Sequence, residues 1–70
     1  MMPLSMVNIG ETKNIVKING KDDTRRFLAN LGFVEGASVT VVSEISGNMI
    51  VNIKDARVAI DRGMANRIMV

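Results

Sequence analysis

The sequence predicts a small, mainly β domain: a barrel of about five short strands with one short α-helix after the first strand. Three observations point to this fold. Short runs of alternating apolar and polar residues recur along the chain, turns that contain glycine separate these runs, and one run has the spacing of a helix. The 70 residues allow one domain, residues 1–70, whose small core every strand must help to fill.

The predicted helix ends within the segment RRFLANLGFVEG, residues 25–36. Phe27 and Leu31 lie four apart, and Leu28 and Leu31 three apart, so we expect them to share one face. Gly32 follows at the position where a left-handed residue commonly ends a helix. Phe33 would then fold back on Leu28, which is the hydrophobic contact of a Schellman motif. Because a helix of this length is not stable alone, we expect it to dock on the strands.

Charged residues dominate the start of this helix. Asp22 or Asp23 can act as the N-cap, because a short carboxylate accepts hydrogen bonds from the free N–H groups of the first turn. Arg25 and Arg26 place positive charge where the helix dipole disfavours it. One interpretation is that Asp22 pairs with Arg26 while Arg25 is solvated. The other is that one of the two arginines contacts a partner.

The remaining elements are predicted from apolar alternation and from turn residues. Each is a short strand or a single helical turn. In chain order we expect a helical turn over residues 3–6 with Leu4 inward; a strand over residues 13–18 with Val16 and Ile18 on one face and Ile15 on the other; a strand over residues 37–45 with Val39, Val41 and Ile45 inward; a hairpin turn at residues 46–48; a strand with Met49, Val51 and Ile53 inward; a turn at residues 54–55; a strand with Val58 and Ile60 inward; a helical turn from a capping Asp61 through Ala65; and a closing strand over residues 67–70, with Ile68 and Val70 on one face, that pairs near the first.

Composition argues against several classes of function. The chain has no histidine and no cysteine, so the commonest general base, the commonest metal ligands and any disulfide are missing. Its seven acidic residues are dispersed, its glycines match neither the P-loop nor the dinucleotide motif, and its net charge is only +2. We therefore expect no enzyme activity, no catalytic residue, no cofactor, no metal site and no membrane-inserted segment.

The composition allows two further kinds of binding surface, one for a protein partner and one for nucleic acid. The six methionines can fill gaps in the core, or Met6, Met64 and Met69 can form an exposed soft patch for a partner. A small barrel can also bind nucleic acid, and this is the alternative function. Single-strand binders use aromatic platforms, whereas this chain has only Phe27 and Phe33, and we expect both in the core. A protein partner is therefore favoured, with no nucleic acid expected.

Laid out in this order, the chain resembles the ferrous-iron transport protein A (FeoA) family over nearly its whole length. The resemblance rests on the order and spacing of short motifs: Leu4, Gly10, Val16-x-Ile18, Arg26-x-Leu28-x-x-Leu31-Gly32, Gly36, Val39 with Val41, Arg57-Val58-Ala59-Ile60, and Ala65-x-x-Ile68-x-Val70. Two departures are Asp55, where the family commonly has glycine, and Glu35, where it often has proline. Aspartate tolerates the turn that glycine would make.

The resemblance implies an SH3-like β-barrel, a family-level association with transition metal ions, and a cytoplasmic accessory role in bacterial ferrous-iron uptake. The implied partner is the large membrane transporter of that system, contacted through its cytoplasmic GTPase domain. The same module occurs at the C-terminus of metal-dependent repressors. Because this chain carries no DNA-binding helices, we expect a free-standing adaptor. Its residues do not themselves imply iron binding.

The surface left outside the barrel is the predicted contact surface for that partner. It consists of helix and turn residues and of apolar residues off the predicted inward faces: Arg25, Asn30, Glu35, Ile15, Val42 and Ile50. We expect Arg25 to supply a charged contact, and the apolar residues that stay exposed together to supply the centre. The competing account is that Arg25 is solvated and the chain itself covers the apolar residues.

Overall fold

The computed structural model describes residues 1–70 and confirms a mainly β fold. It has six strands in two antiparallel sheets, because the first predicted strand is broken in two. In chain order the elements are η1 (Leu4–Met6), β1 (Thr12–Asn14), β2 (Lys17–Ile18), α1 (Asp22–Asn30), β3 (Ser38–Ile45), β4 (Asn48–Ile53), β5 (Ala56–Asp61), α2 (Arg62–Ala65) and β6 (Ile68–Met69). The strand order is β1-β3-β4-β5 in the larger sheet, and β2 pairs with β6 in the smaller one. No helix combines the length and the hydrophobicity that crossing a lipid bilayer requires.

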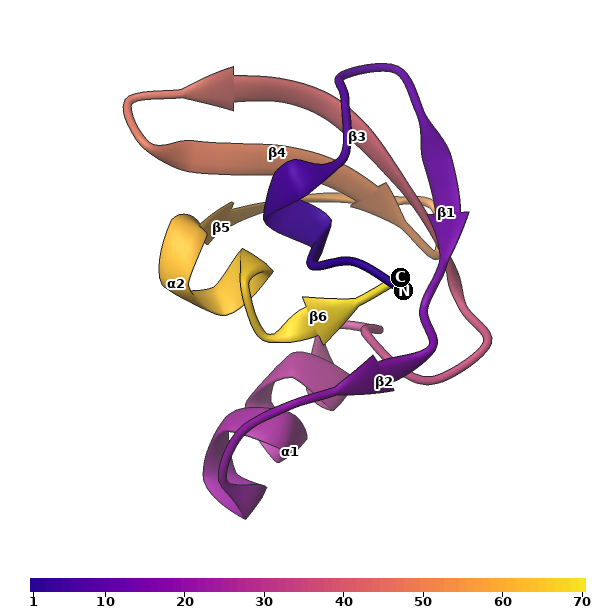
Figure 1. Ribbon diagram of the computed structural model, residues 1–70, viewed down its shortest axis with the longest axis vertical. Coiled ribbons are helices and arrows are strands. Elements are labelled where there is room, and N and C mark those ends of the chain that lie inside the picture. The colour runs from indigo at the N-terminus through magenta and orange to yellow at the C-terminus, as the bar shows by residue number, and fades with distance from the viewer.

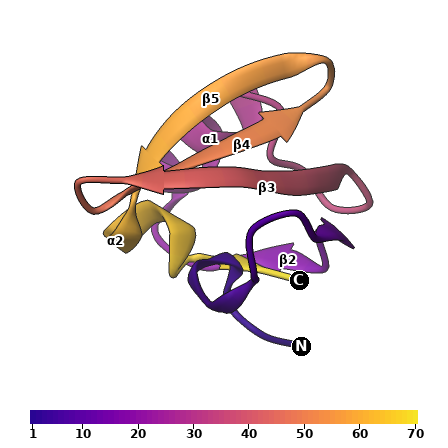
Figure 2. The same ribbon diagram turned by 90° about the horizontal axis from the view of Figure 1, so that it is seen from above.

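The larger sheet curves over η1 and α2, with the β2–β6 pair beyond them and α1 next to β2 (Figure 1). A view from above shows η1, α2 and β2 on the same side of β3 (Figure 2). The closing strand β6 pairs with β2 through Ile18 and Ile68, which confirms that the last strand lies beside the first part of the chain. The two ends of the chain also meet, since Met2 and Val70 exchange backbone hydrogen bonds of 2.8 and 2.7 Å.

Thirteen buried apolar side chains form one core, and no polar side chain is buried with them. They come from η1, both short helices, both sheets and the loops between: Leu4, Val7, Ile15, Leu28, Phe33, Val39, Val41, Met49, Val51, Ile53, Ile60, Ala65 and Ile68. The inward faces predicted for β4 and β5 are confirmed, with Val58 half-buried and Ile60 buried. All elements except the polar strand β1 thus contribute apolar side chains to the core or to its edge, as the small size of the chain requires.

The two single helical turns are also confirmed. Leu4 of η1 is completely buried. Asp61 caps α2, because its Oδ1 accepts a hydrogen bond of 2.8 Å from the Met64 N–H. The Ser5 hydroxyl donates to the Asn66 side-chain oxygen, and this exposed hydrogen bond links η1 to the end of α2.

Two tight turns set the register of β3, β4 and β5. Ser46 and Gly47 have φ values of 50° and 83°, and Lys54 and Asp55 have φ values of 49° and 64°. Two successive left-handed residues match the twist of antiparallel strands and close a two-residue hairpin. Asp55 therefore makes the turn that the sequence predicted for it.

The end of α1 is the predicted Schellman motif. Gly32 has φ of 107°, and its N–H donates to the Ala29 carbonyl at 2.9 Å. The Phe33 N–H donates back to the Leu28 carbonyl at 3.0 Å. Leu28 and Phe33 are both completely buried, so this turn drives two large side chains into the core.

The start of α1 differs from the prediction. Lys21 is the N-cap residue and makes no side-chain cap bond, so the expectation that Asp22 or Asp23 caps the helix is wrong. Both aspartates lie in the first turn, where their charge still favours the helix dipole. The expected core position of Phe27 is also wrong, since this side chain is 52% exposed. A nine-residue helix that is anchored through Leu28 turns Phe27 toward solvent.

The first predicted strand breaks at Ile15, and its alternation is wrong there. β1 ends at Asn14, and Ile15 bonds instead to the loop before β3: its N–H donates to Ala37 at 2.9 Å, and its carbonyl accepts from Gly36 at 2.8 Å. This bend turns Ile15 into the core with 2% exposure and leaves Val16 53% exposed. Because side chains alternate along a strand, a break of one residue turns the side chains after it to the opposite face from the one predicted.

A register shift in β3 produces the other correction. The pairing with β4 slips between Val41 and Ser43, which is the position of a β-bulge. Val39 and Val41 are buried before the shift, as predicted, but Ile45 after it is 59% exposed rather than inward. Val42, at the shift itself, is half-buried.

Replacing Gly32 by alanine should lower the melting temperature. A Cβ in the left-handed region costs about 1–2 kcal/mol, which shifts the midpoint of a domain this small by several degrees. Gly63 of α2 is the matched control, because its φ is not left-handed and alanine is the better helix former. Thermal unfolding followed by circular dichroism should separate the two variants, and equal melting temperatures would show that the turn at Gly32 is not under this constraint.

Truncating Ile68 to alanine should destabilise the fold by about 2–5 kcal/mol, because a completely buried side chain is lost from β6. This strand pairs the C-terminal end of the chain with β2 near its N-terminal end. Val16→Ala, on the paired segment but 53% exposed, should change the free energy of unfolding by about 0.5 kcal/mol or less. Urea denaturation measures both. A small effect at Ile68 would contradict the role given to β6.

Candidate functional site: a groove beside helix α1

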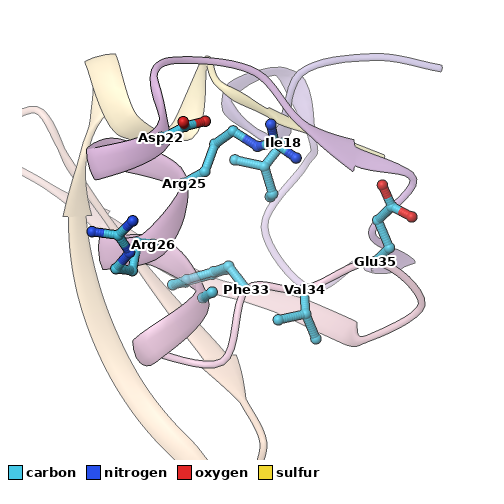
Figure 3. Close-up of a pocket in the computed structure, with 8 residues that line it drawn as sticks. Ile18, Asp22, Arg25, Arg26, Phe33, Val34 and Glu35 are labelled. Atoms are coloured by element: carbon cyan, nitrogen blue, oxygen red, sulfur yellow. The ribbon is translucent and has the colours of Figure 1, made fainter.

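An open groove of about 620 Å³ lies between α1, β2 and the loop that follows α1. Its walls are made of residues from these three segments: Ile18, Asp22, Arg25, Arg26, Ala29, Phe33, Val34 and Glu35. Figure 3 shows the charged residues of α1 on one side and Ile18, Val34 and Glu35 around the rest of the opening. The groove thus combines an apolar lining with charges at its rim.

The helix wall follows from helical periodicity. Asp22, Arg25, Arg26 and Ala29 lie at positions i, i+3, i+4 and i+7, which form one face of a helix. Leu28 lies on the adjacent face and fastens α1 to the core. The anchoring of Leu28 therefore decides which face of α1 borders the groove.

The other walls come from β2 and from the turn after Gly32. Phe33 is completely buried and forms the floor, while Ile18 and Val34 are half-buried and border the opening. The loop is held in place by the hydrogen bonds of Ile15, described above, and by a bond of 3.1 Å from the Ala37 N–H to the Val34 carbonyl. Apolar surface at the mouth of the groove is thus fixed by backbone contacts.

Two of the charged residues at the rim, Arg25 and Glu35, form no ion pair within the chain. The structure has two ion pairs, Arg26 with Asp23 at 3.8 Å and Arg62 with Glu44 at 3.2 Å. The predicted pairing of Asp22 with Arg26 is therefore wrong, because Arg26 pairs instead with Asp23, three residues before it. Arg25 and Glu35 form no ion pair and are exposed, so both are free to face a partner.

The structure brings together only two of the predicted contact residues. Arg25 and Glu35 both line the groove. Asn30 is exposed on α1 but lies outside the groove lining, and Ile15 is buried and cannot reach a partner. The remaining two predicted residues, Val42 and Ile50, are half-buried on the larger sheet and do not border this groove.

Sequence reasoning did not identify the apolar lining. It placed Ile18 and Phe33 in the core and gave Val34 no role, although the structure puts all three around the groove. The i, i+3, i+4, i+7 spacing from Asp22 to Ala29 was the available signal for the helix wall.

The other candidate binding sites on the surface have fewer features of a docking site than the groove beside α1. A second hollow, between β4, β5 and the start of β3, is lined almost entirely by polar residues. Among the methionines proposed as a soft patch, Met6 is 63% exposed, whereas Met64 and Met69 are half-buried and Met64 packs against the core. No three acidic side chains lie close enough together to hold a metal ion.

Comparison with known proteins identifies the family. A family model described as the FeoA domain matches residues 2–70. A Methanocaldococcus jannaschii protein, proposed to be an Fe(2+) transport protein A, is 31% identical over 70 residues, which cover 100% of this chain and 85% of that protein.

Solved structures agree with this assignment. The crystal structure of an iron uptake regulatory protein (FeoA) is 33% identical, with a TM-score of 0.92, and the match covers 99% of this chain and 92% of that one. FeoA of Stenotrophomonas maltophilia, solved with zinc and described as a prokaryotic SH3 domain protein, is 25% identical with a TM-score of 0.87, covering 100% and 89%. These likenesses confirm the expected SH3-like fold, and the chain belongs to the FeoA family.

Proposed function

We propose that this chain is a cytoplasmic accessory protein of ferrous-iron uptake, and that it docks on the cytoplasmic GTPase domain of the membrane iron transporter through the groove beside α1. Its family and the name of its M. jannaschii relative support the link to ferrous iron. The observation that carries the docking site is the groove itself, in which unpaired Arg25 and Glu35 flank exposed apolar surface.

The chemistry of the groove defines what the partner must present. An apolar side chain can bury itself between Ile18 and Val34 over the floor made by Phe33. In Figure 3 the Arg25 side chain extends from α1 over the groove, and Glu35 lies at the opposite rim. A matching surface therefore carries an acidic group for Arg25 and a basic group for Glu35, on either side of an apolar centre.

The role of the chain in this interaction is recognition. The apolar centre supplies affinity, because it removes nonpolar surface from water. The rim charges orient the partner and speed its association, an effect that salt screens. The chain then acts as an adaptor that carries no chemistry of its own.

Charge reversal at Arg25 tests this proposal. Arg25→Glu should weaken binding to the isolated GTPase domain about five- to tenfold at low salt, because one rim attraction becomes a repulsion. The effect should shrink as salt is raised. Calorimetry or interferometry over a salt series measures it. Thermal unfolding should change little, since Arg25 is exposed and makes no ion pair.

Lys54→Glu is the matched control, since it makes the same change of charge at an exposed turn outside the groove. Equal binding of wild type and Arg25→Glu at every salt concentration would show that α1 is not the docking face. Binding of random-sequence RNA by the wild type, lost in Arg25→Glu, would instead favour the nucleic-acid function.

A further inference from the structure

Strand β5 leaves one edge of the larger sheet without a neighbour. It is the last strand in the order β1-β3-β4-β5, and it lies at the rim of the sheet in Figure 2. None of the backbone hydrogen bonds made outside the helices and strands involves residues 56–61. Six residues of unpaired strand edge are a ready template for another strand.

The hairpin turn decides which backbone groups face outward. Lys54 and Asp55 form a two-residue turn, so Ile53 and Ala56 are the pair that closes the β4–β5 ladder. Alternate residues of an antiparallel strand bond to the same neighbour. Val58 therefore directs its N–H and carbonyl groups to β4, and Arg57 and Ala59 direct theirs to the free edge.

The sequence of this strand is complementary to itself. Two copies that pair antiparallel about a twofold axis at Ala59 place Arg57 opposite Asp61 of the second copy, and Asp61 opposite its Arg57. On the core side of the sheet, the same register places Val58 of one copy opposite Ile60 of the other. In this register even-numbered residues of β5 pair with even-numbered residues, and odd-numbered residues pair with odd-numbered ones. The core-facing side chains of the two copies therefore lie on the same side of the joined sheet.

We propose that the β5 edge is a self-association surface, at which two copies of this chain pair into one continuous eight-stranded sheet. The occupant is a second copy because the strand's own charges select it: both Arg57–Asp61 pairs are attractive only in the antiparallel register centred on Ala59. The outer apolar surface also becomes continuous, since Ile50 lies beside Ala59 in the β4–β5 ladder of each copy.

The side chains involved retain the groups that pairing needs. Arg57 donates through Nε to the Asn52 side-chain oxygen at 3.3 Å, which leaves its two terminal nitrogens for a carboxylate. Asp61 uses Oδ1 to cap α2, which leaves Oδ2 for an arginine. No β5 residue lines the groove beside α1, so self-association and docking use separate surfaces.

Ala59→Pro is the variant that tests the proposal. Its N–H faces the free edge, so proline removes no bond to β4 but removes both central bonds between the copies. We expect sedimentation of the wild type, from micromolar to millimolar concentration, to show a monomer–dimer equilibrium, and Ala59→Pro to remain monomeric with an unchanged circular dichroism spectrum. In the wild type, the Arg57 and Ala59 amides should gain protection from hydrogen exchange as concentration rises.

Asp61→Asn tests the charge pairing while it keeps the α2 cap, because asparagine caps equally well. It should weaken the dimer about fivefold, since two exposed ion pairs are lost, and it remains informative if the proline variant fails to fold. Lys54→Gln, which removes one charge from the same hairpin outside the register, should have no effect. A wild type that stays monomeric, or a dimer that survives Ala59→Pro and leaves these amides unprotected, would overturn the proposal.

Discussion

The turn at Gly32 is the constraint on which the arrangement of this molecule depends. A helix of nine residues is too short to persist in water, so α1 exists only where its side chains are held by the rest of the chain. The left-handed conformation at Gly32 brings Leu28 and Phe33 into the core from either side of the helix end. Burying two such side chains contributes about 3–6 kcal/mol, a large share of the stability of a small domain.

The groove is a consequence of this anchoring. Since Leu28 fastens one face of α1, the face with Arg25 must border β2, and the turn that buries Phe33 also brings Val34 to the opening. The interior is entirely apolar, so every charged side chain lies at the surface. Arg25 and Glu35, which form no ion pair, are the charges that the proposed docking uses at the groove. Arg57 and Asp61 are the charges that the proposed pairing of two copies uses at β5.

Much of the fold could be predicted because it obeys local rules. Gly32, the hairpin turns and the alternation of Met49, Val51 and Ile53 depend on conformational preferences that a sequence displays directly. The errors at Ile15 and Ile45 share another cause. One error lies at the break between β1 and β2, and the other follows the register shift in β3. Each irregularity displaces the chain by one residue, so the side chains after it face the opposite side of the sheet from the one predicted. Both are set by tertiary pairing rather than by local sequence.

The candidate site was less predictable for a related reason. Arg25 and Glu35 were identified because they are charged and lie outside the core pattern, which a sequence shows. The apolar lining was missed because Ile18 and Val34 are half-buried, and periodicity sorts residues into inside and outside without an intermediate class. Val42 and Ile50 were correctly placed off the inward faces, but only the folded chain shows that they lie on a different surface from α1.

The most direct test of the docking face is nuclear magnetic resonance of the isotopically labelled chain during titration with the unlabelled GTPase domain. If the groove beside α1 is the docking face, the largest amide shift changes will fall on Ile18, Arg25, Val34 and Glu35, with little change along β4. Changes concentrated on the outer surface of the larger sheet, around Ile50, with an unaffected groove, would contradict this account.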